Sequence, residues 1–281
     1  MTPQIRIARD AGVCYGVERA LKLAYGAAEQ AGHAYTLGPL IHNPRVVTDL
    51  ANEGVSVTDD LRQLCADDTL IIRTHGVEAA QISEAEARGI TVIDATCPYV
   101  RKVQQAVRTL SAEGYQIIII GEPDHPEVIA VRSHANEGAL VISTPADIPT
   151  DFSAHKAGVV VQTTQTLDAL QEVVAALTPC CQELRIYNTI CDATSKRQEA
   201  TRELALNSEV MVVVGGQNSG NTTRLAEISQ DTGAHTYHIE RPEELQANWF
   251  KGVERIGVTA GASTPAEHLD SVVERIEELT A

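Results

Sequence analysis

The hydrophobic pattern of this chain alternates between short β-branched runs and longer segments with helical periodicity. The runs that predict strands lie at 5–8, 69–73, 91–94, 116–120, 158–161, 184–187, 209–214 and 255–258. Strands that alternate with helical segments are typical of α/β architecture. The sequence therefore predicts an α/β fold, and it has no low-complexity tract that would separate the domains.

A threefold repeat is visible in the spacing of polar residues. Three predicted strands lead into a cysteine, at Cys14, Cys97 and Cys191. Twenty-eight residues after these cysteines lie His42, His125 and Ser219, each in a loop that follows a strand. The next strand of each unit ends at Thr74-His75, at Gln162-Thr163-Thr164 and at Ala262-Ser263. We therefore predict three pseudo-equivalent α/β domains at 14–96, 97–189 and 190–281, with the strand in 1–13 added to the third.

The repeated positions follow strands, and functional loops of parallel α/β units lie at the carboxyl ends of their strands. Three such units around an axis would direct these loops to a common centre. Proline follows several of the positions, as in His42-Asn43-Pro44, Cys97-Pro98 and His125-Pro126. Proline is favoured at the first helical position, so helix N-termini with free N–H groups are expected there. Thr264 and Glu267 predict a capping box at the start of the last helix.

Composition and charge exclude several classes of protein. The 281 residues carry a formal net charge of −16, which argues against sequence-independent binding to nucleic acid or to an anionic membrane. Helix N-termini can still bind a small anion, and the Gly-rich segment GGQNSGNTT has the composition of a phosphate-binding turn. No apolar run is long enough to span a bilayer and no signal peptide is recognisable, so we expect a cytoplasmic protein.

Three equivalent cysteines in a reducing compartment are suited to a metal cluster, because soft thiolates select iron–sulfur or zinc centres. A cuboidal cluster with three protein thiolates has one iron open to substrate. The alternative is that all three are buried structural cysteines. Cys65, Cys180 and Cys181 have no partners in the repeat and are given no ligand role. Glu127, in the first turn of a predicted helix, is either a capping group or a proton donor.

The chain resembles the 4-hydroxy-3-methylbut-2-enyl diphosphate reductase family over nearly its whole length. The resemblance rests on GVCYGVERAL, LGPLIHNPRVV, TLIIRTHGV, DATCPYV, GEPDHPEV, VVVQTTQT, NTICDATSKRQEA, GGQNSGNTTRLAEIS and GVTAGASTP, in this order. It implies a trefoil of three α/β domains around a central 4Fe-4S cluster. It also implies the last step of the non-mevalonate isoprenoid pathway, which yields isopentenyl and dimethylallyl diphosphate, with a ferredoxin or flavodoxin as electron donor.

The resemblance also implies roles for individual residues. Cys14, Cys97 and Cys191 match the cluster ligands. The positions that match diphosphate contacts are His42, His75, His125, Ser219, Asn221 and Ser263. Glu127 matches the proton-delivering acid, and Thr163 a contact near the substrate hydroxyl. Gly220 stands where some members have a second serine, so one hydroxyl donor is absent; a backbone N–H or water can replace a hydrogen bond worth about 0.5–1.5 kcal/mol.

Three other functions fit part of the pattern. Another three-cysteine cluster enzyme, such as quinolinate synthase, would use the open iron for dehydration, but the HNP, THGV and NSGN loops favour a diphosphate over a dicarboxylate. A non-catalytic iron–sulfur sensor or electron carrier would not need Glu127 or the converging anion-binding positions. A structural zinc protein is disfavoured because closed zinc sites normally have four ligands.

Overall fold

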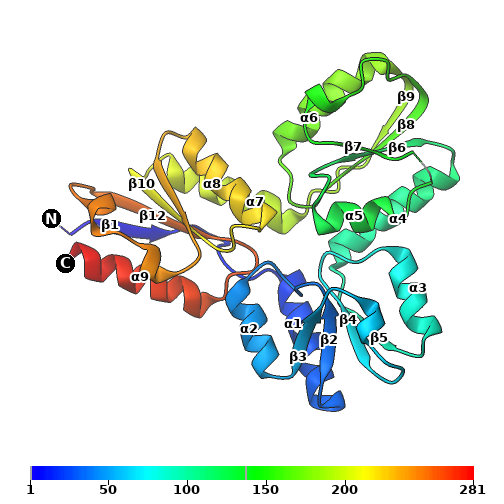
Figure 1. Ribbon diagram of the computed structural model, residues 1–281. Coiled ribbons are helices and arrows are strands. Elements are labelled where there is room, and N and C mark those ends of the chain that lie inside the picture. Colours follow the sequence, from blue (N-terminus) through cyan, green and yellow to red (C-terminus); the bar gives the residue numbers. More distant parts are fainter. Residues whose placement is uncertain (1, 137) are drawn as a thin grey trace. The chain divides into compact units, whose positions relative to one another are not determined.

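The computed structural model describes residues 2–136 and 138–281, which form three four-stranded parallel sheets with helices on their faces (Figure 1). The first sheet comprises β2 (Ala34–Leu37), β3 (Val55–Thr58), β4 (Thr69–Ile72) and β5 (Thr91–Asp94), in the order β3-β2-β4-β5. The second comprises β6 (Gln116–Ile120), β7 (Leu140–Ile142), β8 (Ala154–Val161) and β9 (Cys181–Ile186), in the order β7-β6-β8-β9. The third comprises β1 (Gln4–Ile7), β10 (Val210–Val214), β11 (His235–Ile239) and β12 (Arg255–Ala260), in the order β1-β12-β10-β11. The predicted α/β class is confirmed.

Contacts divide the described chain into two compact units. The terminal unit comprises residues 2–17, 42–44 and 192–281, and it contains the third sheet. The internal unit comprises residues 18–41 and 45–191, and it contains the first two sheets. The three domain boundaries and the trefoil arrangement stay predictions.

The helices connect the strands within and between the sheets. Those between the first strand and the second sheet are α1 (Tyr15–Ala31), α2 (Pro44–Asn52), α3 (Ala79–Ala87) and α4 (Pro98–Ala112). The remaining ones are α5 (Pro126–Arg132), α6 (Leu167–Leu177), α7 (Asp192–Ala205), α8 (Gly220–Asp231) and α9 (Ala266–Thr280). Three helices begin at the prolines that the sequence singled out, because proline has no N–H to leave unpaired in the first turn.

The predicted capping box at α9 is wrong. Pro265 occupies the N-cap, and no side chain among the described residues caps this helix with a hydrogen bond. The Thr264 hydroxyl is fully buried and donates instead to the carbonyl of Val214 at 3.1 Å. A hydroxyl buried in this way needs a local acceptor, and the end of β10 supplies it.

Each sheet is buried by helices because a parallel sheet is apolar on both faces. In the second sheet, Ile117 belongs to a core cluster with Val107 and Leu110 of α4. The next residue, Ile118, points to the other face and packs with Val173 of α6. Figure 1 shows α4 and α6 on opposite sides of this sheet. Successive side chains of a strand point to opposite faces of the sheet, so alternate residues of this continuous apolar run pack into two different cores.

The fourth strand of each sheet goes beyond the predicted repeat unit, which has three. The added strands β3, β7 and β11 each pair with the strand that precedes the repeated His or Ser loop. They are edge strands of three to five residues and are partly exposed, so their hydrophobic signal is weak.

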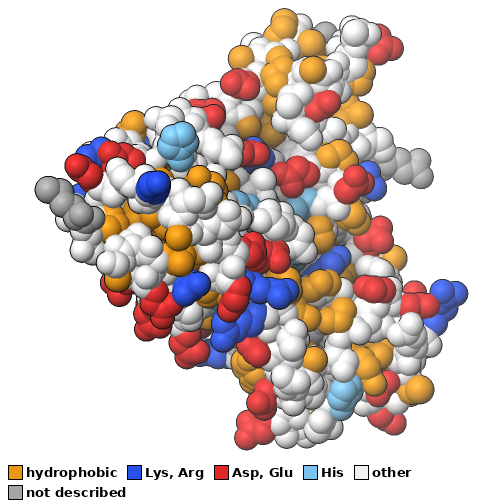
Figure 2. All heavy atoms as spheres, turned by 60° about the vertical axis from the view of Figure 1, so that its left-hand side comes forward, with side chains coloured by type: hydrophobic (Ala, Val, Ile, Leu, Met, Phe, Trp, Pro, Cys, Tyr) orange, Lys and Arg blue, Asp and Glu red, His pale blue; other side chains and the backbone are white. Residues whose placement is uncertain are grey.

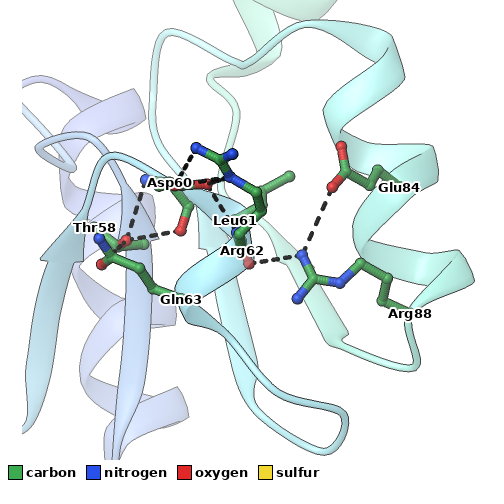
Figure 3. A network of polar contacts seen from close by, with 7 residues as sticks. All are labelled: Thr58, Asp60, Leu61, Arg62, Gln63, Glu84 and Arg88. Atoms are coloured by element: carbon green, nitrogen blue, oxygen red, sulfur yellow. Dashed lines mark hydrogen bonds and ion pairs between the residues drawn. The ribbon is translucent and has the colours of Figure 1, made fainter.

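A polar network holds the connection between β3 and β4 in the first sheet (Figure 3). Asp60 accepts hydrogen bonds from the backbone N–H and the Nε–H of Arg62, at 2.9 and 3.0 Å. The Arg88 guanidinium donates to the carbonyl of Leu61 at 2.7 Å, and Leu61 is itself buried in the core of this sheet. These contacts satisfy backbone groups that the short turn leaves outside the ladder.

Charged side chains of both signs lie on the surface. On the face shown in Figure 2, acidic side chains are spread among basic ones. Among the described residues, no helix is both long and apolar enough to cross a membrane.

Candidate active site

The three repeated cysteines occupy equivalent positions in the three sheets. Each follows an edge strand and directly precedes a helix. Their backbone N–H groups donate to carbonyls two residues beyond the end of the neighbouring strand: Cys14 to Ala262 at 3.2 Å, Cys97 to Thr74 at 2.9 Å, and Cys191 to Thr163 at 3.1 Å. The repeat found in the spacing is therefore also a repeat of backbone geometry.

The chemistry of these cysteines fits a metal cluster. Among the described residues none of the three forms a disulfide, and all three are partly exposed. Each stands at a helix N-terminus, where the helix dipole favours a negatively charged ligand atom. The other cysteines have no equivalent anchoring: Cys65 is exposed, and the Cys180 sulfur contacts a carbonyl of its own helix region, that of Ala176, at 3.7 Å.

The second set of repeated positions is also equivalent in the three sheets. His42, His125 and Ser219 each lie five residues beyond the end of a strand, namely β2, β6 and β10. These strands hold the same place in their sheets, between an edge strand and the strand next to the cysteine's strand. The loops thus leave equivalent carboxyl ends, as a repeat of α/β units requires.

Within the terminal unit, the His42 loop is fixed to the loop after β12. The Asn43 side-chain amide donates to the carbonyl of Ser263 at 2.8 Å, and the Ser263 hydroxyl donates to the carbonyl of His42 at 3.1 Å. Gly216 allows a third segment to approach, because a Cβ there would lie 2.7 Å from the His42 carbonyl oxygen. Only glycine permits this contact without a shift of the backbone.

The N-terminus of α8 presents polar groups from Ser219, Gly220 and Asn221. Ser219 is the N-cap, and its hydroxyl oxygen accepts from the backbone N–H and the hydroxyl of Thr222, at 3.3 and 2.9 Å. Gly220 contributes only its backbone N–H, which belongs to the turn that lacks intrahelical acceptors. Both side-chain amide atoms of Asn221 are buried, and among the described residues they have no hydrogen-bond partner. A buried amide of this kind costs free energy unless a ligand engages it.

In the internal unit, His75 and His125 lie side by side. Their rings meet edge to face, with centroids 5.5 Å apart. The Nδ1 atom of His125 accepts from the backbone N–H of Glu127 at 3.1 Å and so caps α5. Burial, followed by the nearby Arg73 guanidinium, lowers the pKa of His125 to about 4. The imidazole is therefore neutral near pH 7, and with Nδ1 as an acceptor its proton lies on Nε2.

Glu127, on α5, and Thr163, two residues beyond the end of β8, form a buried pair. The Thr163 backbone N–H donates to Oε1 of Glu127, and its hydroxyl donates to Oε2, both at 2.7 Å. Burial raises the pKa of Glu127 to about 7, although both Thr163 hydrogen bonds oppose the change. The carboxyl can thus hold or release a proton near neutral pH, a property that sequence alone left undecided.

Arg73 is a residue of this region that the sequence reasoning did not single out. Its Nε–H donates to the carbonyl of Gly76 at 3.2 Å, which braces the turn that carries His75. One guanidinium nitrogen lies over Gly38, where a Cβ would be 2.5 Å away. Burial lowers the pKa of Arg73 from its ordinary value, while Asp59 opposes this change. Its position directly before Thr74-His75 was the available signal.

Comparison with known proteins relates this arrangement to one family. The family described as "LytB protein" matches residues 5–277. A relative from Geobacter sulfurreducens is 46% identical over 275 residues, covering 98% of this chain and 97% of the relative. One from Aquifex aeolicus is 44% identical over 279 residues, covering 98% and 96%. Both are named 4-hydroxy-3-methylbut-2-enyl diphosphate reductase.

Two solved structures are also similar. One, described as (E)-4-hydroxy-3-methyl-but-2-enyl diphosphate reductase, the terminal enzyme of the non-mevalonate pathway, is 44% identical, with a TM-score of 0.71 over 99% of this chain and 100% of that one. The other, E-1-hydroxy-2-methyl-but-2-enyl-4-diphosphate reductase from Plasmodium falciparum, is 27% identical, with a TM-score of 0.90 over 98% of this chain and 88% of that one. Since both the family match and these relatives span nearly the whole chain, the chain belongs to the LytB family.

Proposed function

We propose that this chain reduces (E)-4-hydroxy-3-methylbut-2-enyl diphosphate to isopentenyl diphosphate and dimethylallyl diphosphate, the last step of the non-mevalonate isoprenoid pathway. The observation that carries the proposal is the full-length match to reductases of this name, at 46% identity in one relative. The reaction breaks the allylic C–O bond, forms a C–H bond at either end of the allyl system, and consumes two electrons and two protons with release of water.

The family implies an iron–sulfur cofactor, and we assign a 4Fe-4S cluster to Cys14, Cys97 and Cys191. Three partly exposed cysteines at equivalent helix N-termini support this assignment. When bound, such a cluster supplies electrons and a Lewis-acidic iron with an open position. The protein's own contribution is to hold, orient and protonate the substrate.

The diphosphate would be bound by histidine, serine and asparagine side chains and by backbone N–H groups, which explains how a chain of charge −16 accepts an anion without lysine or arginine. His42, His75, His125, Ser219, Gly220, Asn221 and Ser263 are the residues assigned to this role. The neutral His125 imidazole can donate from Nε2. The unsatisfied Asn221 amide and the α8 N-terminus supply further donors. A missing hydroxyl at Gly220 leaves the backbone N–H of that residue in place.

Proton delivery is assigned to Glu127 with Thr163. A carboxyl whose pKa is raised to about 7 is protonated in a large fraction of the molecules at neutral pH. The Thr163 hydroxyl, 2.7 Å from Oε2, can pass that proton on and receive it back. The backbone hydrogen bond to Oε1 holds the carboxyl in one orientation. Electrons would come from a ferredoxin or flavodoxin.

The deciding experiment is anaerobic purification with iron and sulfide analysis, followed by turnover of the allylic diphosphate with reduced methyl viologen. About four irons per chain are expected for the assigned cluster. Cys14→Ser should lose iron, while the matched control Cys65→Ser should keep it. Zinc, or no metal, together with no product would refute the proposal, and conversion of a dicarboxylate instead would favour the dehydratase alternative.

A further inference from the structure

A basic hollow lies in the internal unit beside Cys97. It has a volume of about 450 Å³ and is formed by α3, the end of β5, α4 and the segment after α5. Its cationic side chains are Arg101, Lys102 and Arg108, all exposed. Among the described residues that line it, only Asp94 carries a carboxylate.

The balance of charge in this hollow is positive. Arg101 bonds both to the Asp94 carboxylate, at 2.9 Å, and to its backbone carbonyl, at 3.0 Å, so the single acid is already neutralised. Lys102 and Arg108 are left as net positive charges. His134 lies 3.1 Å from Arg108, and burial, followed by the charge of Arg108, lowers its pKa to about 4, so it adds no charge. A locally basic surface is unexpected on a chain of charge −16.

Two of the three positive side chains of α4, those of Arg101 and Arg108, lie on the face of the helix that begins at Cys97. Cys97 is the N-cap of α4, and its carbonyl accepts from the backbone N–H of Arg101 at 3.0 Å. Arg101, Gln105 and Arg108 follow at intervals of three or four residues, which places them on one side of the helix. At a rise of 1.5 Å per residue, this stripe extends about 16 Å from Cys97.

Arg19 extends the basic surface to the other side of the cysteine turn. Its guanidinium donates to the carbonyls of Thr96 and Asp94, both at 3.3 Å. Positive side chains thus surround the segment that enters Cys97 from β5 as well as the helix that leaves it.

We propose that this α4 surface is the docking site for a small acidic electron-carrier protein, which would deliver electrons beside Cys97. The inference rests on the proposed function, because Cys97 must hold the cluster for the location to be useful. Complementary charge accelerates encounter and sets orientation, and a partner repelled by the rest of an acidic protein would be directed to this surface. The diphosphate substrate has its own assigned donors, and four cations, Arg19 included, are few for a nucleic acid strand.

The test compares two double variants that change the net charge equally. Lys102→Glu with Arg108→Glu reverses the docking surface. Lys251→Glu with Arg241→Glu is the matched control, because it also exchanges one exposed lysine and one exposed arginine, both in the terminal unit. The probe is an acidic 2Fe-2S ferredoxin, and its Kd for the holoenzyme is measured at low and high ionic strength. Turnover is measured with reduced ferredoxin and, separately, with reduced methyl viologen.

We expect the docking-surface variant to raise both the Kd and the KM for ferredoxin about tenfold at low salt, with the difference shrinking at high salt. Turnover with methyl viologen should stay within about twofold of the unmodified enzyme, since neither residue belongs to the assigned active site. Equal Kd values for the two variants would overturn the proposal, as would tighter binding of a single-stranded oligonucleotide than of ferredoxin. Absence of viologen-driven turnover in the unmodified enzyme would refute the proposed function instead, while the Kd comparison would still decide the docking site.

Discussion

Replacement of Glu127 by glutamine separates the two roles that this carboxyl could have. The side chain is buried, and its two oxygens accept hydrogen bonds of 2.7 Å from Thr163. Glutamine has nearly the same shape, so it can still accept from the Thr163 N–H, but it cannot donate a carboxylic proton. General acid catalysis is typically worth about 10²–10⁴-fold in rate, and we expect at least a loss of about 10²-fold in turnover.

The same substitution should change how stability depends on pH. Burial raises the pKa of Glu127 from its ordinary value of 4.5 to about 7 in the folded chain. Between these values the folded chain binds the proton and the unfolded chain does not, so the free energy of unfolding falls as pH rises through this window. The full loss is on the order of 3 kcal/mol, at 1.36 kcal/mol for each pH unit in which the proton is bound only by the folded state. Glutamine does not titrate and should remove this contribution.

Urea unfolding of metal-free wild type and Glu127→Gln at pH 4.5, 6 and 8 measures this difference. We expect the variant to gain stability relative to wild type as pH rises, by up to about 3 kcal/mol at pH 8. Glu172→Gln, at an exposed position of α6, is the control for removal of a carboxylate and should alter neither turnover nor the pH dependence. Parallel pH profiles for wild type and Glu127→Gln would refute the raised pKa, and wild-type turnover in the variant would refute the acid role.

Three further predictions concern binding, titration and packing. Asn221→Ala should weaken diphosphate binding, measured as a higher KM. The free protein should be as stable as wild type or more stable, because the substitution removes a buried amide without a partner among the described residues. Lower stability in thermal unfolding would contradict this prediction. Arg73→Gln should raise the pKa of His125 in an NMR titration, since the guanidinium charge disfavours the imidazolium; an unchanged or lower pKa would show that the charge has no such effect. Leu110→Ala, in the core of the second sheet, should lower the free energy of unfolding in urea by about 2–5 kcal/mol. The control Leu206→Ala, at a position that is 67% exposed, should lower it by less than about 0.5 kcal/mol. Equal losses would contradict the packing described.

Spacing along the sequence was sufficient to predict the α/β class and the central strands, because these depend on local signals. Apolar β-branched runs mark the central strands, and prolines mark three helix starts. The distance of 28 residues between each cysteine and its polar loop reflects one helix and one strand of similar length in each unit. The edge strands β3, β7 and β11 were the exception, since short and partly exposed strands carry little hydrophobic signal.

The repeat and the family resemblance together selected the candidate residues, but they left the state of those residues open. Glu127 could be a cap or an acid until its distant partner Thr163 and its complete burial were known. Thr264 fits a capping box by its spacing from Glu267, yet its hydroxyl bonds to β10 in the structure. In both cases the outcome depends on burial and on contacts between segments far apart in the chain. Periodicity and spacing determined which positions reach the strand ends; only the tertiary structure decided which of those groups are buried, and burial is what sets their pKa and their hydrogen-bond partners.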